Sequence, residues 1–205
     1  MPGARTDRAL LVDYGGVLTS DIWSSFADFC ERRGLDRDAA KQLFRDHPEA
    51  VGELRRLETG DADPLDFERR FAKLLGTEPE GLIEGLFAGL GPAEPMIDAV
   101  RRARDGGIPT ALVSNSWVMD HYTDEVRSLF DVLVISGEVG LHKPQPEIYL
   151  MAAERVGAAP AACVFVDDLR ENCEGAERVG MTAVLHRDPS ATIAALEGFL
   201  GLALR

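Results

Sequence analysis

Residues 9–20 read ALLVDYGGVLTS, and the order of apolar, acidic and glycine residues in this stretch decides the fold. The run ALLV has the length and composition of a strand that is buried on both faces, as in a parallel sheet. Asp13 stands where this strand ends, and Gly15 and Gly16 let the backbone approach a bound molecule closely. Ligands of open parallel sheets bind just beyond these strand ends. Asp13 is therefore a candidate nucleophile, although a carboxylate before glycines is also common in ordinary turns.

Four more apolar runs continue this sheet in the second half of the chain. They predict strands at 109–113, 132–135, 162–166 and 182–185. Amphipathic helical stretches separate them, and this alternation is typical of a parallel sheet covered by helices on both faces. The sequence thus predicts an α/β fold with a Rossmann-like, doubly wound parallel sheet.

The segment between residues 20 and 92 has a different pattern. It contains no comparable strand, and its apolar residues recur at helical spacing, first from Trp23 to Cys30 and again from Leu65 to Leu75. We therefore expect a helical cap domain at 20–92, inserted into an α/β core domain made of residues 1–19 and 93–205. At 205 residues the chain is long enough for one domain with an insertion or for two modest domains.

Composition and charge limit the partners. Lys and Arg total 22 against 35 Asp and Glu, and the net charge of -13 repels nucleic acid and anionic membrane surfaces. No run of about 18 apolar residues could span a bilayer, and the apolar run before Asp13 is too short for a signal peptide. Cys30, Cys163 and Cys173 lack the spacing of a zinc site. We expect a cytoplasmic monomer or homodimer that acts on a small molecule.

Two further strand ends carry groups suited to a phosphate. Ser114 and Asn115 follow the strand at 109–113 and precede residues 117–122, which we expect to be helical. A hydroxyl beside the free N–H groups of a helix start can bind phosphate, although a serine there can also simply cap the helix. Lys143 in GLHKPQPEIY precedes a helix expected to begin near Pro146. Its ammonium would relieve the repulsion between a carboxylate nucleophile and a phosphate.

Residues 163–176 read CVFVDDLRENCEGA and place Asp167 and Asp168 at the end of an apolar strand. Two adjacent buried carboxylates are costly without a cation, and their hard oxygen atoms favour Mg²⁺. Capping of the following helix explains one aspartate but not both. Asn172 lies about one helical turn after Asp168 and can return to the same place. The sequence therefore predicts a magnesium site at this strand end.

The ordered set of Asp13, Ser114, Lys143 and Asp167–Asp168, with a helical insertion between the first two, resembles the haloacid dehalogenase superfamily of aspartate-nucleophile hydrolases. The resemblance covers nearly the whole chain. Within the superfamily, the motifs DYGGVL, SNS, HKPQPEIY and DDLRENCEGA are most similar to small phosphatases related to α-D-glucose-1-phosphate phosphatase and to the amino-terminal domain of soluble epoxide hydrolase.

The resemblance implies a role for each motif. Asp13 would attack phosphorus and form an aspartyl-phosphate, while Ser114, Asn115 and Lys143 would bind the phosphoryl group. The Mg²⁺ ligands would be Asp13, the carbonyl of Gly15, Asp168 and, through a water molecule, Asp167. Asn172 would support this shell. The implied activity is Mg²⁺-dependent hydrolysis of a small phosphorylated metabolite, such as a sugar phosphate.

Gly15 departs from the phosphatase pattern, because most phosphatases of this superfamily have an Asp there that protonates the leaving group and activates water. Loss of such help slows a reaction by about 10² to 10⁴, which favours activated esters such as glycosyl or acyl phosphates. Two alternatives remain open. One is a 2-haloacid dehalogenase, which needs no metal and lacks the paired aspartates. The other is a phosphate-binding or regulatory protein with weakened turnover.

The cap is expected to close over the site and select the substrate. Its aromatic and polar residues supply the candidates for substrate contact, which are Trp23, Arg45, His47 and Arg55. His121 and His142 are expected to be structural, and Leu43 and Phe44 are expected to lie in the core of the cap.

Overall fold

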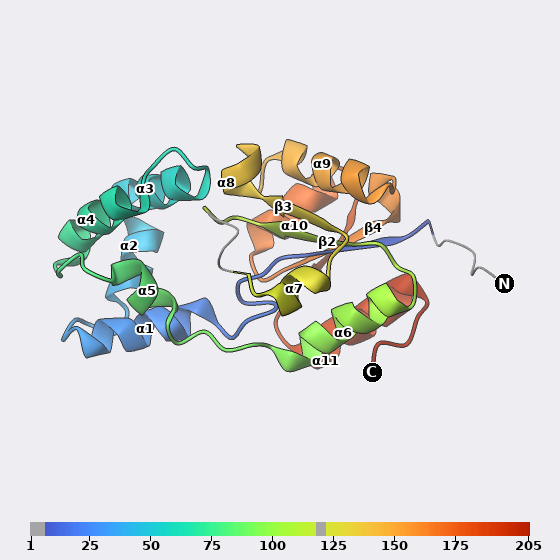
Figure 1. Cartoon of the computed structure of the whole chain (residues 1–205), viewed down its shortest axis with the longest axis horizontal. Coiled ribbons are helices and arrows are strands. Elements are labelled where there is room, and N and C mark those ends of the chain that lie inside the picture. Colours follow the sequence, from blue (N-terminus) through green and yellow to red (C-terminus); the bar gives the residue numbers. More distant parts are fainter. Residues whose placement is uncertain (1–6, 118–121) are drawn as a thin grey trace.

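The computed structural model describes residues 7–117 and 122–205, and within these residues it forms a five-stranded parallel sheet (Figure 1). The strand order is β3-β2-β1-β4-β5, so the first strand of the chain is central. The strands are β1 (Ala9–Val12), β2 (Thr110–Ser114), β3 (Val132–Ile135), β4 (Cys163–Asp167) and β5 (Thr182–Leu185). The predicted α/β class with a Rossmann-like parallel sheet is confirmed.

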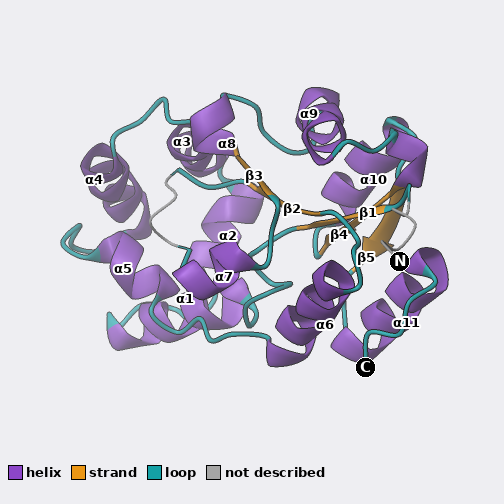
Figure 2. Cartoon of the chain, turned by 45° about the vertical axis from the view of Figure 1, so that its right-hand side comes forward, coloured by secondary structure: helices purple, strands orange, loops and turns teal. Residues whose placement is uncertain are grey.

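Helices cover both faces of the sheet (Figure 2). Alternate side chains of a strand point to opposite faces, so Leu10 and Val12 face one core cluster while Ala9 and Leu11 face the other. The first cluster is covered by α6 (Glu94–Asp105) and α11 (Pro189–Leu200). The second is covered by α9 (Pro146–Val156) and α10 (Arg170–Arg178). Burial on both faces explains why the strands are apolar throughout.

Residues 20–92 form helices with a separate core. These helices are α1 (Ile22–Arg32), α2 (Ala39–Asp46), α3 (Pro48–Glu58), α4 (Pro64–Leu75) and α5 (Leu82–Phe87). Phe26, Phe29, Leu57 and Phe71 are among the side chains buried between them. We keep the division at 20 and 92 as a proposal, supported by this separate core and by an antiparallel bridge that joins Thr19 to Pro92 where the chain leaves and re-enters the sheet domain.

The cap helices lie beside the carboxyl ends of the strands (Figure 1). Besides the chain crossing near Thr19 and Pro92, the cap contacts the core domain at the end of α3. The hydroxyl of Ser136, at the start of α8 (Ser136–Val139), donates a hydrogen bond to the carbonyl of Glu58 at the end of α3. Gly60 packs so closely here that a β-carbon on it would lie 3.0 Å from the carbonyl oxygen of Gly137. The end of α3 is therefore fixed against the core.

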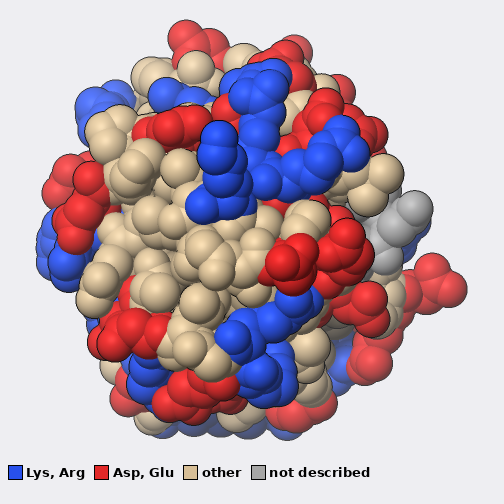
Figure 3. Space-filling model, turned by 90° about the vertical axis from the view of Figure 1, so that its left-hand side faces the viewer, with Lys and Arg blue, Asp and Glu red and all other residues tan. Residues whose placement is uncertain are grey.

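Figure 3 shows the face of the molecule on the cap side, where an area without charged side chains is surrounded by both acidic and basic residues. None of the helices formed by residues 7–117 and 122–205 has the length and apolar character needed to cross a membrane. Two short elements complete the core domain, α7 (Asp124–Ser128) and a 3₁₀ turn at Pro160–Ala162. Residues 118–121 of the helix expected at 117–122, which include His121, lie outside the described residues.

Candidate active site

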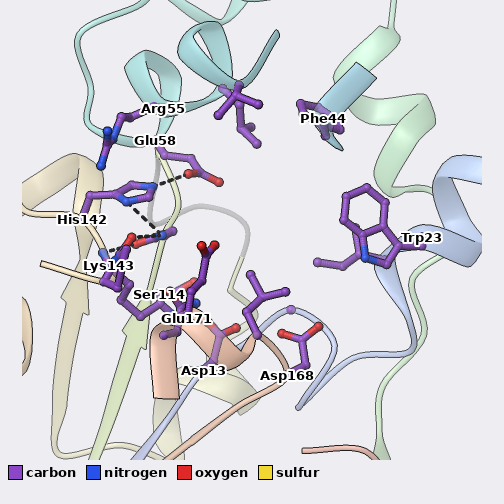
Figure 4. A pocket seen from close by; sticks show the side chains of 18 residues that line it. Asp13, Trp23, Phe44, Arg55, Glu58, Ser114, His142, Lys143, Asp168 and Glu171 are labelled. Carbon is purple, nitrogen blue, oxygen red and sulfur yellow. Dashed lines mark hydrogen bonds and ion pairs between the residues drawn. The ribbon is translucent and has the colours of Figure 1, made fainter. Parts of the chain in front are cut away.

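Three strand ends bring the predicted residues together. Asp13 follows β1, Ser114 is the last residue of β2 and Asp167 is the last residue of β4. The parallel register aligns Val12 with Leu112 on one side and with Val166 on the other. Because these three strands are neighbours and end at the same edge, their terminal side chains share one site (Figure 4).

Lys143 reaches this site from the loop before α9. Its side chain is 1% exposed, and its Nζ lies 2.7 Å from Asp13 Oδ1 and 2.7 Å from Asp167 Oδ2. The amide of Asn115 fixes the backbone of this lysine: Oδ1 accepts from the Lys143 N–H at 2.9 Å, and Nδ2 donates to the Lys143 carbonyl at 3.1 Å. The side chain of Asn115 thus positions Lys143, and its direct contact with phosphate stays a prediction.

The three aspartates form a cluster of oxygen ligands. One carboxylate oxygen from each of Asp13, Asp167 and Asp168 lies within 4.8 Å of the others. Asp167 is fully buried, and its oxygens accept hydrogen bonds from Lys143, from the Asn172 amide at 3.0 and 3.1 Å and from the Leu169 N–H at 2.8 Å. One ammonium cannot balance three carboxylates, so the donor set fits a divalent cation.

The pKa values express the same imbalance of charge. Burial raises the pKa of Asp13 to about 7, and Asp167 adds to this while Lys143 opposes it. Burial and the neighbouring Asp167 also raise the pKa of Asp168 to about 6. Burial alone would lower the pKa of Lys143, but the carboxylates of Asp13 and Asp167 hold it above its ordinary value. A bound divalent cation would favour the ionised form of both Asp13 and Asp168.

The two glycines after Asp13 have different roles. Gly16 has φ +71°, and a β-carbon there would lie 2.7 Å from Asp168 Oδ2, so both conformation and space require glycine. At Gly15 a β-carbon would meet only the end of a side chain, Ile22 Cδ1 at 2.5 Å. The space that a side chain at Gly15 would need is therefore filled by the end of Ile22 from the cap.

A cleft of about 480 Å³ extends from the aspartates to the cap (Figure 4). Asp13, Ser114, Lys143 and Asp168 lie at its base. The cap forms the opposite wall, which consists of Ile22, Trp23, Phe44, Val51, Leu54, Arg55 and Glu58. The base and the wall come from segments far apart in the sequence, so the cleft exists only because the cap docks over the strand ends.

The structure corrects several expectations about the cap. Trp23 and Arg55 line the cleft as expected, but Arg45 and His47 do not. Arg45 is exposed and pairs with its neighbour Asp46, and His47 borders a separate cavity on the cap. Their place on α2 and at its end turns them away from the aspartates. Phe44 stacks on Phe71 in the cap core, as expected, and also borders the cleft.

Three titratable lining residues were not assigned to the site from the sequence. His142 was expected to be structural, yet it borders the cleft, where its Nε2 lies 2.7 Å from Glu58 Oε2 and its Nδ1 lies 3.3 Å from Asn115 Nδ2. Glu58, from the end of α3, and Glu171, from the first turn of α10, also line it. The one available signal was the position of His142 and Glu171 within the motifs HKPQPEIY and DDLRENCEGA.

The fold and this carboxylate site define an α/β protein with a Rossmann-like sheet and an inserted helical cap, and comparison with known families assigns it further. Residues 8–180 match the model of the haloacid dehalogenase-like hydrolase family, and the chain belongs to that family. The predicted superfamily and hydrolase class are confirmed.

Curated relatives include phosphatases. The chain is 29% identical over 166 residues to glyceraldehyde 3-phosphate phosphatase from Methanopyrus kandleri, a match that covers 74% of this chain and 69% of that protein. It is 32% identical over 115 residues to bifunctional epoxide hydrolase 2 from Rattus norvegicus. That match covers 52% of this chain and only 21% of the epoxide hydrolase, so the chain spans about a fifth of that relative.

Solved structures of the same fold cover almost the whole chain. A HAD phosphatase from Thermococcus onnurineus has a TM-score of 0.61 at 25% identity, over 97% of this chain and all (100%) of that one. A HAD family enzyme from Bacteroides thetaiotaomicron, crystallised with magnesium and inorganic phosphate, has a TM-score of 0.66 at 23% identity, over 88% of this chain and 94% of that one. The second likeness establishes the fold alone.

Proposed function

We propose that this protein is a Mg²⁺-dependent phosphatase that acts on a small phosphorylated metabolite through an aspartyl-phosphate on Asp13. The observation that carries the proposal is the contact of the Asp13 carboxylate with the buried Lys143 ammonium, inside a cluster of three aspartates at the strand ends. A dianionic phosphate can approach an ionised carboxylate only where cations offset their repulsion. The phosphatase relatives and the magnesium and phosphate bound by the Bacteroides thetaiotaomicron enzyme support it.

The residues of this chain divide the reaction between them. An oxygen of Asp13 attacks phosphorus, the bond from phosphorus to the ester oxygen breaks, and water then hydrolyses the acyl phosphate to inorganic phosphate and free Asp13. Lys143 favours the ionised form of Asp13 and offsets the charge of the incoming phosphoryl group. Ser114, which is 4% exposed at the base of the cleft, supplies a hydroxyl to the phosphoryl oxygens.

The Mg²⁺ ion would be held by Asp13, Asp168, the Gly15 carbonyl and, through water, Asp167. Bound there, it would stabilise negative charge on the phosphoryl oxygens. The water-mediated role of Asp167 follows from its surroundings, because both of its oxygens already accept hydrogen bonds from protein groups. Asn172 donates hydrogen bonds to Asp167 and would thereby help to hold the ligands of the ion in place.

Gly15 favours substrates with good leaving groups, such as sugar-1-phosphates or acyl phosphates, because no carboxylic acid at that position can protonate the departing oxygen. The same feature favours a second candidate, a phosphate-binding protein with little turnover. We place the protein in the cytoplasm, where the three cysteines, free and buried in the structure, would stay reduced. It would work there as a monomer or homodimer.

Hydrolysis of p-nitrophenyl phosphate tests the proposal. We expect phosphate release in the presence of Mg²⁺, none in EDTA, and none from Asp13→Asn, because that change removes the nucleophile with little alteration of shape. Circular dichroism and urea unfolding of the variant check that its fold is intact. Retained turnover in Asp13→Asn would remove Asp13 from the mechanism. Binding of phosphate without any Mg²⁺-dependent release would favour the phosphate-binding protein.

A further inference from the structure

The part of the cleft beyond the aspartates must receive the organic group of the substrate, and its two sides differ in chemistry. Trp23, Phe44 and Leu54 give the cap side an apolar surface. Glu58 from the end of α3 and Glu171 from α10 add carboxylates on the side of the cleft near His142, and in Figure 4 both side chains point into the space between the cap and the strand ends. Neither of these glutamates takes part in the chemistry proposed for the phosphoryl group.

Glu58 is held in place by His142, whose own orientation is set by Asn115. Asn115 Oδ1 accepts from the Lys143 N–H, so Asn115 Nδ2 is the donor that faces His142 Nδ1 at 3.3 Å. The other ring nitrogen, Nε2, lies 2.7 Å from Glu58 Oε2. The carboxylate of Glu58 is therefore fixed at the edge of the cleft by a side chain that is itself held beside Lys143.

Glu171 adds a second negative charge to the same space. Glu171 lies in the first turn of α10, three residues after Asp168. Its side chain has no hydrogen-bond or ion-pair partner among residues 7–117 and 122–205. Two carboxylates that line one cleft add their potentials. The organic group of a substrate therefore meets two negative charges in this part of the cleft.

Among the described residues of the cleft wall, Arg55 opposes these two charges. It is exposed, and in Figure 4 it lies above His142 at the edge of the cleft. Glu171 is exposed as well, so solvent screens both of these groups, whereas the side chain of Glu58 is 16% exposed and is screened less. The two carboxylates together outweigh the single guanidinium.

We propose that Glu58 and Glu171 are specificity-determining residues, which favour phosphomonoesters whose organic group joins an apolar body to an ammonium group and disfavour those with a second anion. This inference rests on the proposed phosphatase activity of the same cleft. The apolar wall would hold the body of the substrate, and the two glutamates would pair with its ammonium.

Two matched substrates test the proposal, 4-(aminomethyl)phenyl phosphate and 4-carboxyphenyl phosphate, with phenyl phosphate as the uncharged reference. The ring, the phosphate and the ease of departure of the phenol are similar, so the ratio of kcat/KM reports the charge. We expect the ammonium substrate to be favoured about tenfold at low salt, and less at high salt. The double variant Glu58→Gln and Glu171→Gln should bring the ratio close to one.

Glu174→Gln is the matched control, because it makes the same charge change on α10 but lies outside the cleft. It should leave the ratio as in the wild type. A wild-type ratio of one or less, or a ratio that the double variant does not change, overturns the proposal. Preference for the carboxylate that disappears in Arg55→Gln would show that Arg55 dominates instead.

Binding of the corresponding phosphonates, which cannot be hydrolysed, separates this proposal from the proposed activity. Calorimetry with 4-(aminomethyl)phenylphosphonate and 4-carboxyphenylphosphonate in the presence of Mg²⁺ should show the same preference and the same loss of it in the double variant. If no substrate is hydrolysed but this preference is present, the phosphatase proposal fails and the charge selection stands. Equal binding of the two phosphonates overturns the selection.

Discussion

At the scale of single residues, Lys143 is the buried cation that separates Asp13 from Asp167. Its replacement by methionine keeps the length of the side chain but removes the cation that balances two buried carboxylates. We expect Lys143→Met to lower the free energy of unfolding by about 3–5 kcal/mol and to abolish turnover. Urea unfolding measures the loss, and saturating Mg²⁺ should restore part of it.

Lys73→Met provides the control for this variant, because Lys73 is an exposed lysine on α4. That change should alter the free energy of unfolding by no more than about 0.5 kcal/mol. If Lys143→Met were as mild as Lys73→Met, the two aspartates would not depend on the lysine for their charge balance.

Gly15 is the position at which a side chain could supply the missing acid. Gly15→Asp places a carboxyl group in space that the end of the Ile22 side chain now fills, so only that flexible end has to move. We expect the variant to gain at least about tenfold in kcat on phosphate esters with poor leaving groups and little on p-nitrophenyl phosphate. A series of phenyl phosphates measures this dependence.

Gly15→Asn has nearly the same shape as Gly15→Asp but cannot donate a carboxyl proton, so it should show no such gain. If the gain is absent because Ile22 cannot move, the additional change Ile22→Val should produce it. Equal rates for the aspartate and asparagine variants across the whole series, with and without that change, would contradict the role given to the missing acid.

The residues at the base of the site could be predicted from the sequence, and those on its wall only in part, since Trp23 and Arg55 line the wall as expected but Glu58 was not assigned to it. Asp13, Ser114 and Asp167 each terminate an apolar strand, and parallel strands place their ends at one edge. Glu58 lies on a surface helix of the cap, where nothing in the sequence shows which side meets the core. The same uncertainty explains why Arg45 and His47 were wrongly assigned to the cleft.

At the scale of elements, every strand expected from the sequence is present, and the two errors are small. Strands β2 and β4 are each displaced by one residue from the predicted ranges, so Ser114 and Asp167 belong to them. Pairing explains the shift, since Ser114 is aligned with Ile135 and Asp167 with Leu185. The polar character of a residue at the end of an apolar run predicts a loop. Pairing with the adjacent strand nevertheless extends the β-ladder to include that residue.

The helices of the cap were predictable as a class but not one by one. Helical spacing identified residues 20–92 as an insertion of helices. The docking of α3 on α8 depends on Ser136, Gly137 and Gly60, which are small polar or flexible residues without a helical or strand pattern. Because this contact closes one side of the cleft, the volume and lining of the cleft required the structure.

At the scale of the whole molecule, the raised pKa values link stability to pH and metal. Asp13 and Asp168 bind protons more tightly in the folded state, with pKa values of about 7 and about 6, than at the ordinary value of 3.8. Without metal, their contribution to the free energy of unfolding therefore falls as the pH rises from about 4 to about 7. The stabilisation by Mg²⁺ should grow over the same range and level off above pH 7.

Thermal unfolding with Mg²⁺ and with EDTA, at pH values from 5 to 8.5, measures this prediction as the difference between the two midpoints. In Asp13→Asn the difference should be smaller and should depend less on pH, since the ligand with the highest pKa is absent. A difference that stays constant in the wild type across this range would show that neither aspartate takes up a proton when the metal leaves.

The central place of β1 in the sheet has a consequence for synthesis. β1 is synthesised before both of the strands with which it pairs, β2 and β4, and the chain between β1 and β2 contains the whole insertion together with α6. On the ribosome, ALLV has to wait for partners that emerge much later, whereas the insertion, whose contacts are local, can compact in the meantime. The cap can therefore fold before the sheet that carries the aspartates, and the apolar β1 segment stays exposed until β2 and β4 have been made.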